Sequence, residues 1–248
     1  MDSKIKFPTE TIELPSKGLL YPEGHPLSSG KVEMKYMTAK EEDILTNQNY
    51  IKQGIVIDKL LQSLLVTKFN YEDLFLGDKN AILVAARVLG YGKDYSFTYN
   101  NEEITVNLAE LPSVELDESL ILEKGVNLFK YILPHSQNEI TFKLLTGKME
   151  KDIDAEVKGL KRINKNNSAE LSTRLKHQIS SVNEDEDQKT IREFIDNYLL
   201  AKDASAFRVY LKSINPDVKM TFLYEGENSE EEVAIPLQVQ FFWPDARV

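Results

Sequence analysis

The chain has 248 residues, with 30 Lys and Arg against 40 Asp and Glu, which gives a formal net charge of −10. A hydrophobic share of 42%, with 11 Phe and 11 Tyr, is typical of a folded globular protein and excludes extended disorder. The negative excess disfavours general binding to nucleic acid, because phosphates repel it. With no cysteine, the chain offers no disulfide, thiol nucleophile or thiolate metal site.

No apolar run approaches the roughly 20 residues that a membrane-spanning helix needs. Residues 1–15 carry too many charges to form the apolar core of a signal peptide. We therefore expect a soluble protein that is not secreted and that has no membrane partner.

Residues 1–146 are predicted to form an α+β body with an irregular N-terminal arm. The arm, residues 14–26, holds three Pro and two Gly, which favour an ordered path of turns. Alternating apolar and charged residues predict a strand over 32–36. Capping signals and helical spacing predict helices over 38–45, 51–65 and 79–89.

Turn signals add detail to the end of this body. Asp78 is the expected cap of the helix over 79–89, and Gly90 is its expected stop. Apolar alternation around Asn100-Asn101 and around 134–138 predicts two hairpins, with strands over 95–99 and 104–108, and over 126–133 and 139–145.

Residues 147–216 are predicted to be a helical insertion, since apolar residues recur there at helical spacing and strand signals are almost absent. Residues 217–248 are predicted to be a C-terminal β-hairpin that returns to the body, with strands over 218–224 and 233–241 and an acidic turn over 225–232. The fold class is therefore α+β, with mixed helices and antiparallel strands and an inserted helical bundle. The insertion has 13 basic and 12 acidic residues, so the negative excess lies outside it.

No catalytic, cofactor or metal site is predicted. The three histidines are isolated in sequence and lack the spacing of a helical metal site. The acidic clusters are contiguous runs, which are typical of solvated turns rather than of acid–base pairs facing each other across a cleft. The one basic stretch, 158–165, has no aromatic residues for stacking on bases, and its cations suit the C-terminal end of a helix.

Apolar residues near the two termini are the candidate partner-binding residues. They are Leu19 and Tyr21 in the arm, and Phe241, Phe242 and Trp243 near the C-terminus. Large aromatic side chains are typical anchors of protein interfaces. The alternative is that they fix the ends of the chain onto the core, and the sequence leaves both interpretations open.

Several segments together resemble the T4-type baseplate proteins of contractile-tailed bacteriophages, a group that includes small hub subunits and the hub assembly protein. The order of the segments is more specific than any one of them. They are residues 14–22, 37–47, 76–83 with Arg87 and 90–92, and 142–151. Many relatives carry a Cys-x-x-Cys pair in the hairpin that follows the segment matching residues 90–92. This chain has Tyr-Asn-Asn-Glu-Glu there, at 99–103, so no zinc is expected.

The resemblance implies a non-enzymatic assembly factor, or chaperone, that promotes formation of the baseplate hub in the host cytoplasm. Its partners would be other phage tail and hub proteins. The alternative is a structural hub subunit that stays in the virion. A third hypothesis is a hydrolase that uses scattered carboxylates, but no sequence motif supports it. The oligomeric state is left open.

Overall fold

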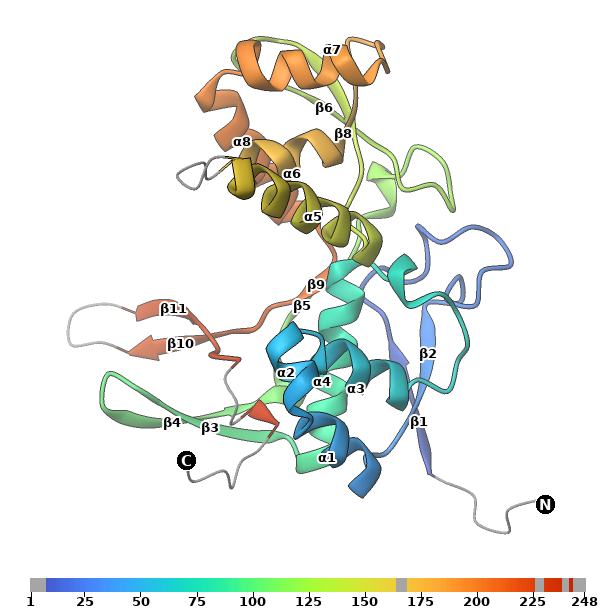
Figure 1. The fold of residues 1–248 in the computed structure, drawn as a ribbon, viewed down its shortest axis with the longest axis vertical. Helices are drawn as coiled ribbons and strands as arrows, with labels where there is room; N and C mark the ends of the chain where they lie inside the picture. Colours follow the sequence, from blue (N-terminus) through green and yellow to red (C-terminus); the bar gives the residue numbers. More distant parts are fainter. Residues whose placement is uncertain (1–7, 164–168, 226–229, 238–240, 243–248) are drawn as a thin grey trace.

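The computed structural model describes residues 8–163, 169–225, 230–237 and 241–242. Over these residues, eight α-helices and a set of antiparallel strands confirm the predicted α+β class. The elements form two lobes, a body and a smaller helical lobe, which meet where the short strands β5 (Ser113–Val114) and β9 (Asp217–Val218) pair (Figure 1). None of the described helices has both the length and the apolar character needed to cross a membrane.

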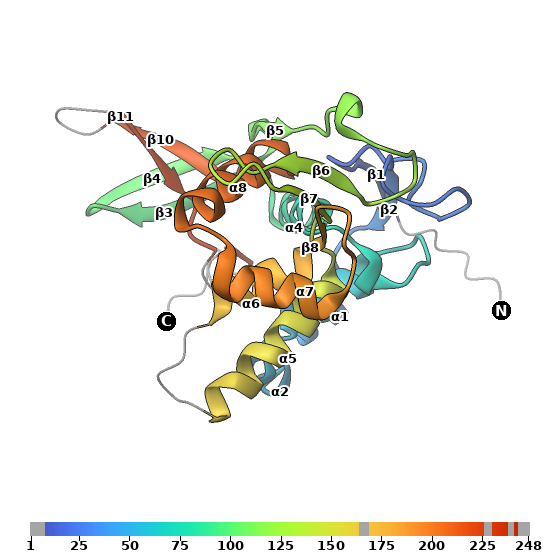
Figure 2. The same ribbon diagram turned by 90° about the horizontal axis from the view of Figure 1, so that it is seen from above.

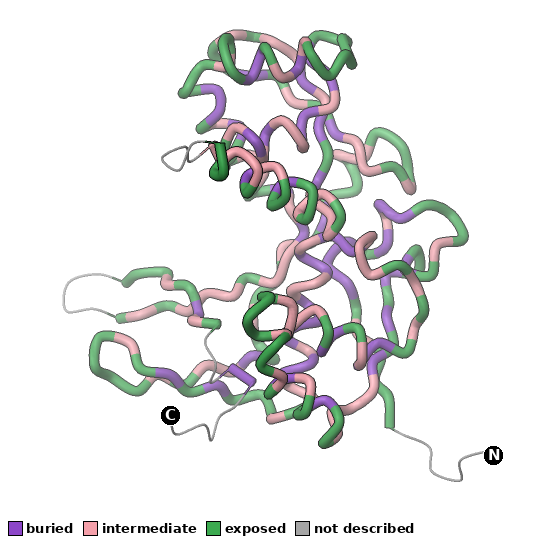
Figure 3. Tube along the Cα trace, viewed as in Figure 1, coloured by how far each residue is buried: buried purple, intermediate pink, exposed green. Residues whose placement is uncertain are grey.

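The body surrounds α4, a 16-residue helix from Leu76 to Tyr91. The other elements of the body pack around it, and Figure 3 shows that buried residues follow α4 toward the junction of the lobes. These elements are α1 (Ala39–Leu45), α2 (Gln48–Gln53), α3 (Val56–Leu64), β1 (Thr9–Glu13), β2 (Lys31–Lys35), β3 (Asp94–Tyr99), β4 (Glu102–Asn107), and the 3-10 turns Tyr71–Asp73, Leu108–Glu110 and Glu118–Leu120.

The helical lobe contains a three-stranded antiparallel sheet in the order β6-β7-β8. One face of this sheet packs on α8, where the rings of Phe142 and Phe207 meet edge to face at 5.0 Å. The elements of the lobe are β6 (Phe129–Ile132), β7 (Glu139–Phe142), α5 (Gly147–Ile163), α6 (Glu170–Gln178), β8 (Ile179–Val182), α7 (Gln188–Glu193), a π-helical turn (Phe194–Tyr198) and α8 (Ala201–Ile214).

The insertion is therefore larger than predicted, and it is not purely helical. Strand β8 lies inside the segment predicted to contain only helices, and it pairs with β7. This pairing draws the hairpin β6–β7 out of the body and into the helical lobe. The chain leaves the body after Gly125, whose backbone N–H donates to the Leu19 carbonyl (2.8 Å), and it returns at β9, which pairs with β5.

Two predicted helix boundaries are also wrong. The helix expected over 51–65 is two helices, because Gly54 adopts a left-handed conformation (φ 69°) and ends α2. Helix α4 begins at Leu76, before Asp78, and Gly92 rather than Gly90 is its C-cap. Asp78 is therefore inside the first turn of α4 and not its cap, and its carboxylate is used elsewhere.

The C-terminal hairpin, β10 (Thr221–Glu225) and β11 (Glu230–Ala234), packs on β3–β4. Phe222 contacts Phe97 and Tyr99, with ring centroids 5.2 and 5.7 Å apart, and Tyr224 contacts Tyr99 at 4.9 Å. The acidic turn is shorter than predicted, because Glu230 begins β11. We call these four strands the double hairpin, and they project from the body (Figure 1).

The predicted start of α1 is a capping box at Thr38 and Glu41. The wholly buried Glu41 side chain accepts hydrogen bonds from Lys35 Nζ (2.7 Å) and Ser63 Oγ (2.7 Å), and from the Thr38 backbone N–H (3.0 Å). Burial alone would raise the pKa of Glu41, but these hydrogen bonds outweigh it and lower the pKa from 4.5 to about 2.

We expect Glu41→Gln to destabilise the protein at neutral pH by about 2–3 kcal/mol, because the amide keeps the shape but loses the charge. The folded-state pKa is below the unfolded one, so the stabilisation is present above pH 4.5 and is lost as pH falls toward 2. Urea unfolding at several pH values should show the gap between the two proteins closing over this range. A gap that stays constant down to pH 2 would contradict this assignment.

Candidate protein-docking surfaces

The N-terminal arm is held on α4 by a buried carboxylate. Asp78 accepts hydrogen bonds from the Ser16 backbone N–H (3.0 Å), the Ser16 hydroxyl (2.7 Å) and the Tyr21 hydroxyl (2.7 Å). The Tyr21 hydroxyl in turn accepts from the Phe75 backbone N–H at 3.3 Å. Burial raises the pKa of Asp78 although these donors favour the charged form. Two of the segments that carry the family resemblance therefore form one packed unit.

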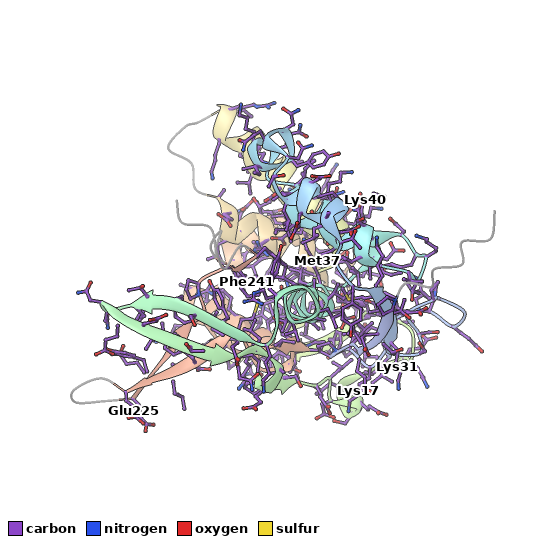
Figure 4. The ribbon with its side chains drawn as sticks, turned by 90° about the horizontal axis from the view of Figure 1, so that it is seen from below. Lys17, Lys31, Met37, Lys40, Glu225 and Phe241 are labelled. Carbon is purple, nitrogen blue, oxygen red and sulfur yellow. The ribbon has the colours of Figure 1, made fainter. Side chains whose placement is uncertain are left out.

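Most of the predicted partner-binding residues belong to the core. Tyr21, Phe241 and Phe242 are only 4%, 2% and 3% exposed, and Leu19 is half-buried against the same core. Phe241 packs edge to face on Tyr95, and Figure 4 shows it among the side chains of the body. The side chains of Tyr21, Phe241 and Phe242 are therefore not available to a partner, and they fix the ends of the chain onto the core, which is the second interpretation. Trp243 lies outside the described residues.

The three histidines lie on different elements. His25 stacks on Tyr21 at 4.9 Å, His135 is in the β6–β7 turn, and His177 on α6 is 2.9 Å from Glu156. His177 is partly buried in this contact with Glu156, whereas its polar neighbours in the sequence predict a solvated side chain. Within the described part of the chain, no three His, Asp or Glu side chains gather as metal ligands.

An apolar groove of about 400 Å³ runs along α4, and it is the first candidate docking surface. Its floor is one side of the helix, and its walls are the N-terminal arm and the segment that follows β4. The lining includes Ile12, Leu14, Ala81, Val84, Ala85, Val88, Leu89, Leu108, Leu111 and Val218. Val88 and Leu89 remain partly exposed there, so α4, although most of its residues are apolar, has one open side.

Charged residues form the rim of the α4 groove. Lys17 pairs with Glu115 at 2.6 Å, and Glu13 pairs with Lys31 at 3.2 Å. Figure 4 shows Lys17 and Lys31 on the same part of the body. An apolar floor with a charged rim is the usual construction of a surface that binds a short peptide segment.

A second groove, of about 630 Å³, lies on the open face of the β6-β7-β8 sheet. Three of its four Lys and Arg side chains are paired with carboxylates: Lys130 with Glu139 (2.9 Å), Lys176 with Asp196 (2.6 Å) and Arg192 with Glu156 (2.8 Å). Glu156 lies between Arg192 and His177, which lower its pKa to about 2. Two of these pairs link α5 to α7 and α6 to the π-helical turn, and the third lies within the sheet. We therefore explain this groove as an ion-pair network within the lobe rather than as a binding site.

Comparison with known proteins gives no match, either to a family model, to a curated protein or to a solved structure. The resemblance to phage baseplate proteins therefore rests on the sequence segments alone.

Proposed function

We propose that this protein is a non-enzymatic assembly factor for the hub of a contractile phage tail baseplate. It acts in the host cytoplasm by binding an apolar segment of another tail protein in the α4 groove. The observation that carries the proposal is that the groove is built by segments that carry the family resemblance. The arm residues Leu14, Pro15 and Lys17 form one wall, and α4 forms the floor.

The chemistry of the groove supports a peptide ligand. Ala85, Val88 and Leu89 are partly exposed on one side of α4, and a partner that covers them removes apolar surface from water. Each square ångström of apolar surface buried in this way contributes about 25 cal/mol. A short aliphatic helix or strand with polar flanks would fill the groove and meet its charged rim.

A substitution in the floor of the groove tests this proposal. We expect Val88→Glu to weaken binding to the purified hub proteins of the same phage by about 100-fold, because the partner would bury an unpaired carboxylate. Titration calorimetry with wild type and variant measures the difference.

Ile51→Glu is the matched control, since Ile51 is an exposed apolar residue on α2 and does not line the groove. It should leave the affinity unchanged, and thermal melts of both variants check that they fold. Equal affinity of Val88→Glu and wild type would contradict docking in the α4 groove.

Mass spectrometry of purified virions separates the assembly factor from the structural alternative. The proposal predicts that the protein is present in infected cells and absent from finished particles. Detection in virions at the same copy number as a hub protein would instead assign it as a structural subunit.

A further inference from the structure

The double hairpin has an outer face that no described element covers. Residues 221, 223 and 225 of β10 share this face with their partners on β11, because side chains alternate along a strand. Leu223 is 69% exposed at its centre. Leu223 lies directly opposite Glu232, and Glu225 lies directly opposite Glu230, so three carboxylates surround one apolar side chain.

The described residues of the four strands contain no Lys or Arg to balance these charges. They carry seven acidic residues: Asp94, Glu102, Glu103, Glu225, Glu230, Glu231 and Glu232. Like charges directly opposite each other across a hairpin destabilise it, as at Glu225 and Glu230. Figure 4 places Glu225 at the outer end of the double hairpin, away from the body.

Helix α8 has an exposed face of the opposite charge. Its exposed residues include Lys202, Arg208 and Lys212, none of which forms an ion pair with another described residue, and Val209, which is 70% exposed. The only acidic residue of α8, Asp203, is wholly buried and accepts hydrogen bonds from the His135 and Ser136 backbone N–H groups (2.8 and 3.0 Å). Three cations therefore surround one exposed valine.

The same contrast in charge, between an acidic part and a basic part, holds for the chain as a whole. Residues 126–214 hold 15 basic and 13 acidic residues, a net charge of +2. The rest of the chain holds 15 basic and 27 acidic residues, a net charge of −12. The double hairpin and α8 extend to the same side of the β5–β9 junction (Figure 1), and Figure 2 shows α8 over the base of the double hairpin.

We propose that two copies of this chain associate around a two-fold axis, with the outer face of each double hairpin docked on α8 of the other copy. Glu225, Glu230 and Glu232 meet Lys202, Arg208 and Lys212, and Leu223 packs near Val209. A two-fold axis that passes between the two surfaces exchanges them, so the same contact forms twice. A second copy is the occupant because this chain itself supplies both complementary surfaces.

Sedimentation equilibrium on the full-length chain measures the association. At on the order of 100 µM protein and about 0.05 M salt, we expect a mass of twice 28.4 kDa. At about 1 M salt the screening length falls to about 3 Å, and the mass should return to that of one chain. A single-chain mass at low salt would overturn the proposal.

A charge swap tests which surfaces meet. Glu230→Lys with Glu232→Lys on the double hairpin should abolish the dimer, and so should Lys202→Glu with Arg208→Glu on α8. In each variant alone, every contact joins like charges. In an equimolar mixture, each contact again joins opposite charges, so the dimer should form between the two variants.

The hairpin substitutions also relieve the repulsion at Glu225, so loss of the dimer would not reflect loss of folding. The matched control is Lys158→Glu with Lys161→Glu on α5, which makes the same change in charge in the same lobe and should leave the dimer intact. A swap mixture that stays monomeric, or variants that dimerise alone, would contradict this interface. Neither outcome bears on the α4 groove.

Discussion

Replacing Gly77 with alanine is expected to lower the free energy of unfolding by about 3 kcal/mol or more. A Cβ atom at this position would lie 1.7 Å from the Pro216 carbonyl oxygen and 2.9 Å from the Asp217 Cα. Both neighbours are backbone atoms, so no side-chain rotation relieves the clash. Helix α4 meets the chain here as it returns from the helical lobe, and the substitution should therefore also loosen the junction of the two lobes.

Gly159→Ala is the matched control for the Gly77 substitution. Gly159 lies inside α5, and a Cβ there would meet no atom within 4 Å. Alanine should therefore stabilise the protein by about 0.5–1 kcal/mol, because it is the better helix former. Urea unfolding measures both variants, and equal effects at the two glycines would contradict the close approach of α4 to Pro216.

Asp78→Ala is expected to destabilise the protein by about 3–5 kcal/mol. The substitution removes the acceptor of three buried hydrogen bonds and leaves donors on Ser16 and Tyr21 without a partner. The arm should then separate from α4 more readily, so limited proteolysis should cleave within residues 14–30 while the helical lobe stays intact.

Two controls separate the buried network from a general loss of charge. Tyr21→Phe removes one of the three hydrogen bonds and should cost about 1–2 kcal/mol. Asp43→Ala removes an exposed carboxylate on α1 and should change stability by less than about 0.5 kcal/mol. Urea unfolding in which Asp78→Ala behaves like Asp43→Ala would show that Asp78 does not hold the arm.

Elements with a strong local signal were predictable from the sequence. Thr38 and Glu41 indicate the start of α1, and the structure has a capping box there. Asn100 and Asn101 indicate a hairpin turn, and both have positive φ values, 49° and 65°. In each case residues close in sequence determine the conformation, so no information about the rest of the fold is needed.

Strand β8 and the size of the helical lobe were not predictable in the same way. The four residues Ile179–Val182 follow α6 directly, and they become a strand because β7, some 40 residues earlier in the chain, supplies a partner. The sequence carries no local sign of that pairing. The same is true of Asp78, whose position near the start of α4 favours a cap, whereas distant residues of the arm use its carboxylate.

The candidate site depends on tertiary structure in two ways. Aromatic residues at a chain end are equally typical of a core and of an interface, so the sequence does not decide between them. The burial of Phe241 and Phe242 in the structure assigns both to the core. Helix α4 is apolar on most sides, which predicts a buried helix. The α4 groove exists because its neighbours leave Ala85, Val88 and Leu89 partly uncovered, and no sequence pattern specifies that gap.

Site-specific photo-crosslinking in infected cells tests the central claim, docking of a tail protein in the α4 groove, most directly. A photoreactive amino acid at Val88 should yield a covalent product in which mass spectrometry identifies an apolar segment of a baseplate hub protein, and the same group at Ile51 should not. Crosslinks from Val88 that match those from Ile51, or that contain no tail protein, would contradict it.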